Sequence, residues 1–243
     1  MMKSGSLLII KTGSTLPSLL AGKGDFEDWV LAGMVIGGDQ VSIVDVRDGT
    51  PFPVYDVLSG VVITGSHSMV TDHDPWSERT AAWLAGAVEK QIPILGICYG
   101  HQLLAYALGG KVGDNPNGHE YGTVEVRLNE NAHQDPLLGG LPNPIKMHTS
   151  HAQSVLELPA RARLLASSDM DQHQAFVAGE CAWGVQFHPE FDAEATRGYI
   201  RHSRSVLLAE QQDPDRLIEQ STDTPYGSQI LQQFVQFTHR RKT

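Results

Sequence analysis

Cysteine is scarce in this sequence, with only Cys98 and Cys181 among 243 residues. Two cysteines cannot form the disulfide framework of a small secreted domain, and one of them is free to act as a nucleophile. Long apolar runs are missing as well, because the run Leu7–Ile10 is too short for a signal sequence or a membrane span. We therefore expect a cytoplasmic protein that does not insert into a membrane.

Basic residues are also fewer than acidic residues. The chain carries 18 Lys and Arg against 28 Asp and Glu, which gives a net charge of −10. A nucleic acid or an anionic membrane surface is therefore not favoured as a partner. Only the end of the chain, His239–Lys242, is basic, and we interpret it as a solvated tail. Repeats, low-complexity segments and linkers are absent too, which favours a single domain over residues 1–243.

Short apolar strands alternate with amphipathic helices in the first hundred residues. Strands are predicted at Ser6–Lys11, Val41–Val46, Gly60–Gly65 and Ile92–Leu95. Helices are predicted from Asp25, as the N-cap, to Met34 and over Trp76–Lys90, and residues 12–24 are predicted to be a loop. This order predicts an α/β fold, with a mostly parallel central sheet flanked by helices.

The second half of the chain changes character. Residues 121–128 alternate apolar and polar side chains, which predicts a half-exposed antiparallel strand. Further strands are predicted at Ile145–His148, Arg163–Ser167, Gln174–Val177 and Trp183–Phe187, and helices at Ala193–Glu210, Asp215–Gln220 and Ser228–Phe237. We expect a catalytic core over about residues 5–192 and a C-terminal helical extension over about residues 193–243.

A glycine-flanked cysteine lies between a predicted strand and a predicted helix. Cys98 has Gly96 and Gly100 two residues away on either side, and the helix Gln102–Leu108 follows. A nucleophile on so sharp a strand-to-helix turn forms an elbow, where a side chain at either glycine would strike the strand or the helix. The helix N-terminus favours a thiolate and a nearby oxyanion through its partial positive charge and free N–H groups.

A base for this nucleophile follows a later apolar strand. His188 and Glu190 are two residues apart, which places both side chains on one face of an extended segment. Glu190 can then hold the imidazole in one tautomer, as the acid does in a serine triad. An oxyanion needs two N–H donors, and we expect one from Tyr99 and the other from Gly65 or Ser66.

Structural explanations compete with these interpretations. A lone cysteine in an apolar stretch is usually a small buried side chain, which is our interpretation of Cys181. The polar loop after the third strand holds His67, Asp72, His73 and Asp74, a set that could bind zinc or iron, although solvated loops have commoner uses for such residues. We expect neither a metal nor a cofactor.

Taken together, these motifs resemble the class I, or triad-type, glutamine amidotransferase family. The matching residues are Gly96–Gln102, Leu108–Gly110 and Gln186–Glu190. Val62–Ser66 lies where that family has its oxyanion strand, and Met147–Ala152 resembles its Ser-His segment. The resemblance spans about residues 41–191 and implies a flavodoxin-like three-layer fold.

The resemblance implies that the chain hydrolyses the γ-glutamyl amide of glutamine through a thioester on Cys98, releasing ammonia and glutamate. His188 would act as the base and then as the acid for the leaving ammonia, and Glu190 would orient it. The resemblance also implies side-chain or backbone contacts with the α-amino and α-carboxylate groups of this small molecule, from Gln102, Ser150 and His151.

The sequence departs from the family pattern at two places. Many members have Gly-Gly-Pro where this chain has Gly65-Ser66-His67, and Gly-Asp where it has Ala152-Gln153. The chain looks most like stand-alone members related to the glutaminase domains of GMP synthetase, and some plant relatives of these are γ-glutamyl peptidases. A glutaminase could pass its ammonia to a synthase partner. A γ-glutamyl peptidase and a non-catalytic regulatory protein on the same fold stay open as alternatives.

Overall fold

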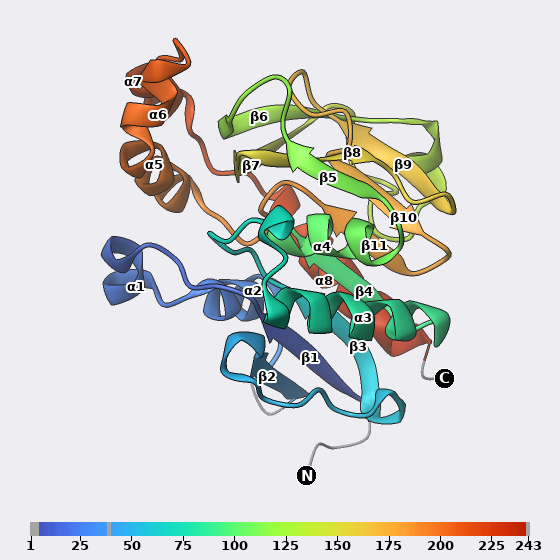
Figure 1. Cartoon of the computed structure of the whole chain (residues 1–243). Helices are drawn as coiled ribbons and strands as arrows, with labels where there is room; N and C mark the ends of the chain where they lie inside the picture. Colours follow the sequence, from blue (N-terminus) through green and yellow to red (C-terminus); the bar gives the residue numbers. More distant parts are fainter. Residues whose placement is uncertain (1–4, 38–39, 242–243) are drawn as a thin grey trace.

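A nine-stranded sheet runs through the computed structural model, which describes residues 5–37 and 40–241 (Figure 1). The strand order is β2-β1-β3-β4-β11-β10-β9-β6-β7. Neighbouring strands are parallel from the first edge through the middle of the sheet: β2 (Val41–Asp45), β1 (Ser6–Lys11), β3 (Leu58–Ile63), β4 (Ile94–Ile97) and β11 (Ala182–Val185). The predicted α/β fold with a mostly parallel central sheet is therefore confirmed.

Antiparallel strands extend the sheet beyond β11. They are β10 (Ala175–Ala178), β9 (Ala162–Ser167), β6 (Glu120–Leu128) and β7 (Ile145–His151). The alternating segment 121–128 is thus correctly predicted as an antiparallel strand. A separate ribbon pairs β5 (Lys111–Asp114) with β8 (Gln153–Glu157), two strands that were not predicted from the sequence.

Helices cover both faces of the parallel strands. On β1, Leu7 and Ile9 pack toward α2 (Phe26–Met34) and α8 (Tyr226–Arg240), whereas Leu8 and Ile10 pack toward α3 (Pro75–Glu89) and α4 (Tyr99–Ala107). This division follows from the alternation of side chains along a strand, and it explains why all four residues are apolar. The result is a three-layer arrangement with α8 behind the sheet (Figure 1).

Some predicted boundaries are shifted by two or three residues, since β4 is Ile94–Ile97 and α4 begins at Tyr99, and two further predictions are wrong. Residues 12–24 are not all loop, because α1 (Pro17–Lys23) forms there with Pro17 in its first turn, a position that suits proline. The helix predicted over 193–210 is divided into α5 (Ala193–His202) and α6 (Arg204–Ala209). It is interrupted at Ser203, whose hydroxyl donates to the Tyr121 hydroxyl at 2.9 Å.

The helices after residue 192 pack in two places. Figure 1 shows α5, α6 and α7 (Pro214–Gln220) at one side of the sheet, whereas α8 returns to the centre. Ile230, Leu231 and Phe234 of α8 are fully buried in the same core as β1 and β11. None of the helices in the described part of the chain is long and apolar enough to cross a bilayer.

Candidate active site

Cys98 occupies a strained turn between β4 and α4. Its backbone has φ 50° and ψ −102°, a conformation that residues with side chains rarely adopt. A Cβ at Gly96 would lie 2.4 Å from the Gly100 carbonyl oxygen, and one at Gly100 would lie 2.6 Å from the Ile63 carbonyl oxygen. The predicted reason for both glycines is confirmed: the turn is too tight for a side chain at either position.

His188 and Glu190 form a buried pair beside this elbow. Glu190 Oε1 lies 2.7 Å from His188 Nδ1, and their side chains are 3% and 0% exposed. The His188 N–H donates to the His148 carbonyl at 2.8 Å, and the Phe191 ring stacks on the imidazole with centroids 3.9 Å apart. These contacts fix the ring in place.

Opposing effects act on the pKa of His188. Burial alone would lower the pKa of His188, but the Glu190 carboxylate and the contact with Cys98 together outweigh burial and raise it. An imidazolium beside Cys98 is the state that favours a thiolate.

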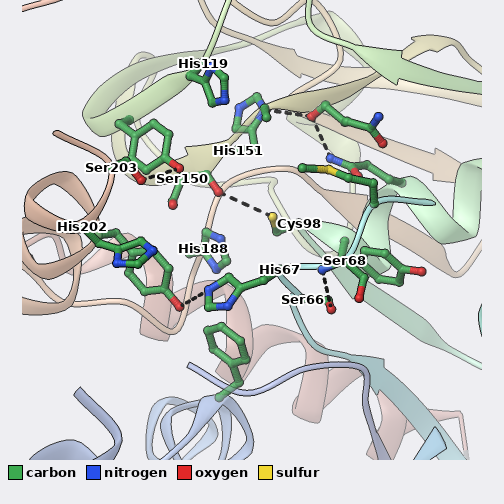
Figure 2. A pocket seen from close by; sticks show the side chains of 18 residues that line it. Ser66, His67, Ser68, Cys98, His119, Ser150, His151, His188, His202 and Ser203 are labelled. Atoms are coloured by element: carbon green, nitrogen blue, oxygen red, sulfur yellow. Dashed lines mark hydrogen bonds between the residues drawn. The ribbon is translucent and has the colours of Figure 1, made fainter. Parts of the chain in front are cut away.

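Cys98 lies in a cavity of about 230 Å³ whose lining residues are drawn in Figure 2. Its Sγ is 3.9 Å from the Ser150 carbonyl oxygen. In this view Ser150 and His151 lie above His188. This volume is below the range of about 300–1,000 Å³ that is usual for drug-sized ligands, so the cavity suits a small molecule.

The residues predicted to form the oxyanion hole lie at the same place. A Cβ on Gly65 would lie 3.1 Å from His188 Cε1 and 3.8 Å from Cys98 Cβ, so its backbone borders both groups. Ser66 lines the cavity, and its hydroxyl donates to the Thr12 carbonyl at 2.9 Å. Tyr99 begins α4, so its N–H is among the donors that a helix leaves unpaired in its first turn.

Gln102, one of the residues predicted to bind substrate, is already hydrogen-bonded within the protein. Gln102 Nε2 donates to the Gln153 carbonyl at 2.7 Å and to Gln186 Oε1 at 3.0 Å. Both amide hydrogens are therefore used inside the protein, which leaves Oε1 of Gln102 for a ligand. Ser150 offers backbone groups, since its carbonyl faces Cys98.

His151 forms a second buried pair, which was not predicted from the sequence. Its Nδ1 lies 3.0 Å from the Gln153 carbonyl oxygen, and its Nε2 lies 2.9 Å from Glu120 Oε2. Both partners accept hydrogen bonds, so both ring nitrogens must donate, and the ring is an imidazolium. Burial opposes this charge, but the bond to Glu120 and its carboxylate charge outweigh burial and raise the pKa of His151.

Other parts of the cavity wall were also missed. They come from segments that are distant in the sequence: Phe26 of α2, His119 and Tyr121 around the start of β6, and Tyr199, His202 and Ser203 on or beside α5. The Tyr199 hydroxyl lies 3.2 Å from His67 Nε2 and 3.0 Å from Thr15 Oγ1. No local motif marks these residues, because only the packing of α2, β6 and α5 in the fold brings them to the cavity that holds Cys98.

The histidines of the polar loop that was considered as a metal site lie in different places. His67 lines the cavity, whereas His73 lies at the surface with its Nδ1 2.8 Å from Glu78 Oε1. Among residues 5–37 and 40–241, no group of three or more His, Cys, Asp or Glu is arranged to hold a metal ion.

The second cysteine lies away from this site. Cys181 directly precedes β11, at the opposite end of the parallel strands from Cys98, which follows β4. It is buried, and burial raises the pKa of its thiol. The interpretation of Cys181 as a small buried side chain is confirmed.

Comparison with known proteins identifies similar sequences. The family described as "Glutamine amidotransferase class-I" matches residues 51–203. A glutamine-hydrolysing GMP synthase subunit from Pyrococcus abyssi is 43% identical over 150 residues, which cover 61% of this chain and 72% of that protein. Gamma-glutamyl peptidase 5 of Arabidopsis thaliana is 31% identical over 184 residues, which cover 74% of this chain and 73% of that protein. The match with the GMP synthase of Clostridium novyi covers only 27% of that longer protein, at 34% identity.

Solved structures share the fold. A glutamine amidotransferase from Thermotoga maritima superimposes with a TM-score of 0.75 at 22% identity, covering 96% of this chain and 97% of that one. A glutamine amidotransferase from Methylobacillus flagellatus gives a TM-score of 0.72 at 24% identity, covering 96% and 95%.

Proposed function

The chain belongs to the class I glutamine amidotransferase family, and on this premise we propose that it hydrolyses the γ-amide of glutamine to glutamate and ammonia through a thioester on Cys98. The observation that carries the proposal is the His188–Glu190 pair, buried against a cysteine on a strained elbow. A purely structural cysteine needs neither a positive φ nor a histidine held by a buried carboxylate.

The reaction begins with proton transfer from Cys98 to His188 Nε2. The thiolate attacks the γ-carbonyl carbon, and the oxyanion that forms accepts hydrogen bonds from the Tyr99 N–H and from the N–H of Gly65 or Ser66. When the amide C–N bond breaks, His188 returns the proton to the departing ammonia. A water molecule, deprotonated by the same imidazole, then cleaves the thioester and releases glutamate.

Glu190 acts through His188 and does not touch the substrate. Its bond to Nδ1 keeps Nε2 directed toward Cys98 and stabilises the imidazolium that forms in each half of the reaction. The free Oε1 of Gln102 and the backbone at Ser150 and His151 are proposed to hold the α-amino and α-carboxylate groups of glutamine. We further propose that residues 1–243 act as one domain, because α8 packs in the same core as the catalytic strands.

A γ-glutamyl peptidase is the second candidate function, favoured by the match to the Arabidopsis thaliana peptidase over 74% of this chain. The acyl-enzyme would be the same, and only the leaving group would differ. The similarity to the Pyrococcus abyssi protein supports a further proposal, that a separate synthase receives the ammonia.

The test is substitution of each cysteine in turn. Cys98→Ala should lower kcat/KM for glutamine by at least about 10³-fold, since the nucleophile is lost, whereas Cys181→Ala should retain wild-type turnover. A diazoketone analogue of glutamine should label the wild-type protein on Cys98 alone. Unchanged hydrolysis in Cys98→Ala would refute the mechanism, and failure of the analogue to label Cys98 would favour a non-catalytic regulatory protein.

A further inference from the structure

The cavity presents imidazole rings and no other ionisable group except Cys98 and its tyrosines. Within the described part of the chain, its lining residues include no Asp, Glu, Lys or Arg. They do include five histidines: His67, His119, His151, His188 and His202. A chain with a net charge of −10 therefore encloses a cavity that presents no carboxylate to a ligand.

Carboxylates lie behind three of these rings. Glu190, Glu120 and Glu210 each contact one cavity histidine, respectively His188, His151 and His119, and none of the three glutamates lines the cavity. A ligand in the cavity thus meets the imidazole of each pair and not its carboxylate. Such a surface favours anionic groups on the ligand and disfavours cationic ones.

The direction of proton transfer identifies where the leaving group must lie. In the proposed reaction, His188 protonates the departing nitrogen, so the leaving group lies on the His188 side of Cys98. Figure 2 shows His67 and His202 on this side, and His151 and His119 on the opposite side, where the γ-glutamyl group would be held. The aromatic ring of Phe26 completes the His188 side, with centroids 6.4 Å from both His188 and His67.

A hydrogen-bonded chain occupies one ring nitrogen of His67 and leaves the other for a ligand. Thr15 Oγ1, the Tyr199 hydroxyl and His67 Nε2 follow one another at 3.0 and 3.2 Å. Burial raises the pKa of Tyr199 and lowers the pKa of His67, so both groups are neutral, and a carboxylate at the other nitrogen of the ring selects the tautomer in which the Tyr199 hydroxyl donates to Nε2. The proton of that ring is then on Nδ1, which makes no hydrogen bond to any residue that the structure describes. Asp25, the acid that acts on His67, is itself paired with Lys11.

We infer that His67, Tyr199 and His202 form a leaving-group subsite that binds a carboxylate, so that the enzyme also cleaves γ-glutamyl amino acids and selects them over γ-glutamyl derivatives of cationic amines. His202, one turn after Tyr199 on α5, lies at the exposed rim and adds a second donor. Ammonia needs no such subsite, because it carries no further group. The inference rests on the proposed function and names the substrate class of the same site.

The chemistry of this cleavage balances in the same way as that of glutamine. The Cys98 sulfur–carbon bond forms, the amide carbon–nitrogen bond breaks, and the amino acid leaves with the proton that Cys98 gave to His188. Water then supplies the hydroxyl that converts the thioester to glutamate and restores the thiol.

The experiment compares kcat/KM for three substrates: glutamine, γ-glutamylglycine and γ-glutamyl-1,4-diaminobutane. The wild-type protein should prefer the glycine derivative to the diamine derivative by about tenfold or more, the effect of one hydrogen bond to a charged group. His67→Leu and, separately, Tyr199→Phe should each reduce this preference severalfold. His73→Gln, on the same loop but at the surface, is the matched control and should leave the preference unchanged.

The outcomes separate the two claims. If glutamine is hydrolysed but the wild-type protein shows no preference for γ-glutamylglycine over the diamine derivative, the subsite is wrong and the glutaminase proposal stands. The subsite is equally wrong if the preference survives in both His67→Leu and Tyr199→Phe. If none of the three substrates is hydrolysed, the proposed function fails and the inference fails with it.

Discussion

Two buried histidine–glutamate pairs lie on either side of Cys98, and they are built from the same residue types. His188 and Glu190 are joined at 2.7 Å, and His151 and Glu120 at 2.9 Å. All four side chains are 3% exposed or less, and the glutamate raises the pKa of the histidine in both pairs. Neither burial nor the glutamate distinguishes them.

The difference lies in the second ring nitrogen. In His151 that nitrogen donates to the Gln153 carbonyl, so neither nitrogen can take up a proton. In His188 the Glu190 bond occupies Nδ1, which leaves Nε2 for the cysteine. One pair is therefore suited to proton transfer and the other to holding a fixed positive charge. A histidine in a buried histidine–glutamate pair is therefore a candidate base only where its second ring nitrogen makes no other hydrogen bond within the protein.

Replacing the glutamate of each pair with glutamine should give the largest difference between the two pairs. Glu190→Gln removes the charge that stabilises the His188 imidazolium, so kcat for glutamine should fall about 10²–10⁴-fold, the range of general acid–base catalysis. KM should change little, because Glu190 does not touch the substrate. Steady-state kinetics of both variants, purified in parallel, provide the measurement. If Glu190→Gln and Glu120→Gln lower kcat equally, the two pairs are not functionally distinct.

The sequence predicts the His188 pair because its determinants are local. Only Pro189 separates His188 from Glu190, and glycines closely flank Cys98, so short-range geometry defines the elbow and the candidate base. The same holds for Asp25, which caps α2 as predicted: its carboxylate accepts from the Phe26 N–H at 2.9 Å. Local rules of capping, steric crowding and alternation are readable from one sequence.

The His151 pair could not be predicted in this way. Glu120 and His151 lie opposite each other only because β6 and β7 pair in one particular register. Tyr199 reaches the cavity only because α5 packs beside it, and Ser203, where the helix is interrupted, bonds to Tyr121 of β6. Strand register and helix docking are determined by long-range packing, so the elbow and its base are apparent from the sequence while most of the cavity wall is not.

Glu120→Gln should lower turnover less than Glu190→Gln does, and it should reduce the unfolding free energy. Glu120→Gln leaves His151 buried without its carboxylate, which should cost about 3 kcal/mol of unfolding free energy. It should also raise KM for glutamine several-fold while kcat stays within about threefold, because His151 positions the Gln153 carbonyl that holds Gln102. Urea titration and steady-state kinetics give both quantities.

The third pair supplies the control for this prediction. His119 and Glu210 are 28% and 30% exposed, so Glu210→Gln should change the unfolding free energy by less than about 1 kcal/mol. Equal losses in Glu120→Gln and Glu210→Gln would contradict a special role for the buried charge.

His148 is a buried histidine that has no glutamate partner in the described part of the chain, so it shows what burial does to the charge of a histidine when that partner is missing. His148 lies on β7, three residues before His151, and its Nδ1 is 3.2 Å from Thr123 Oγ1. Burial, helped by the charge of His188, lowers the pKa of His148 from 6.5 to about 4, although Asp223 and Asp192 act in the opposite sense. His148 is thus neutral under conditions in which His151 is charged.

This difference predicts a small dependence of stability on pH. Between pH 6.5 and about 4, the unfolded chain takes up a proton on His148 that the folded protein does not. Unfolding free energy should therefore fall as the pH falls through that window, by about 3 kcal/mol from this residue. Replacing His148 with Gln removes the titrating group, so the urea midpoint of the variant should decline less steeply from pH 7 to pH 4 than that of the wild type. His73→Gln, at an exposed position, should keep the wild-type slope. Identical slopes for wild type and His148→Gln would mean that His148 takes up its proton in the folded state, and that a glutamate is not what separates the charged histidines from the neutral one.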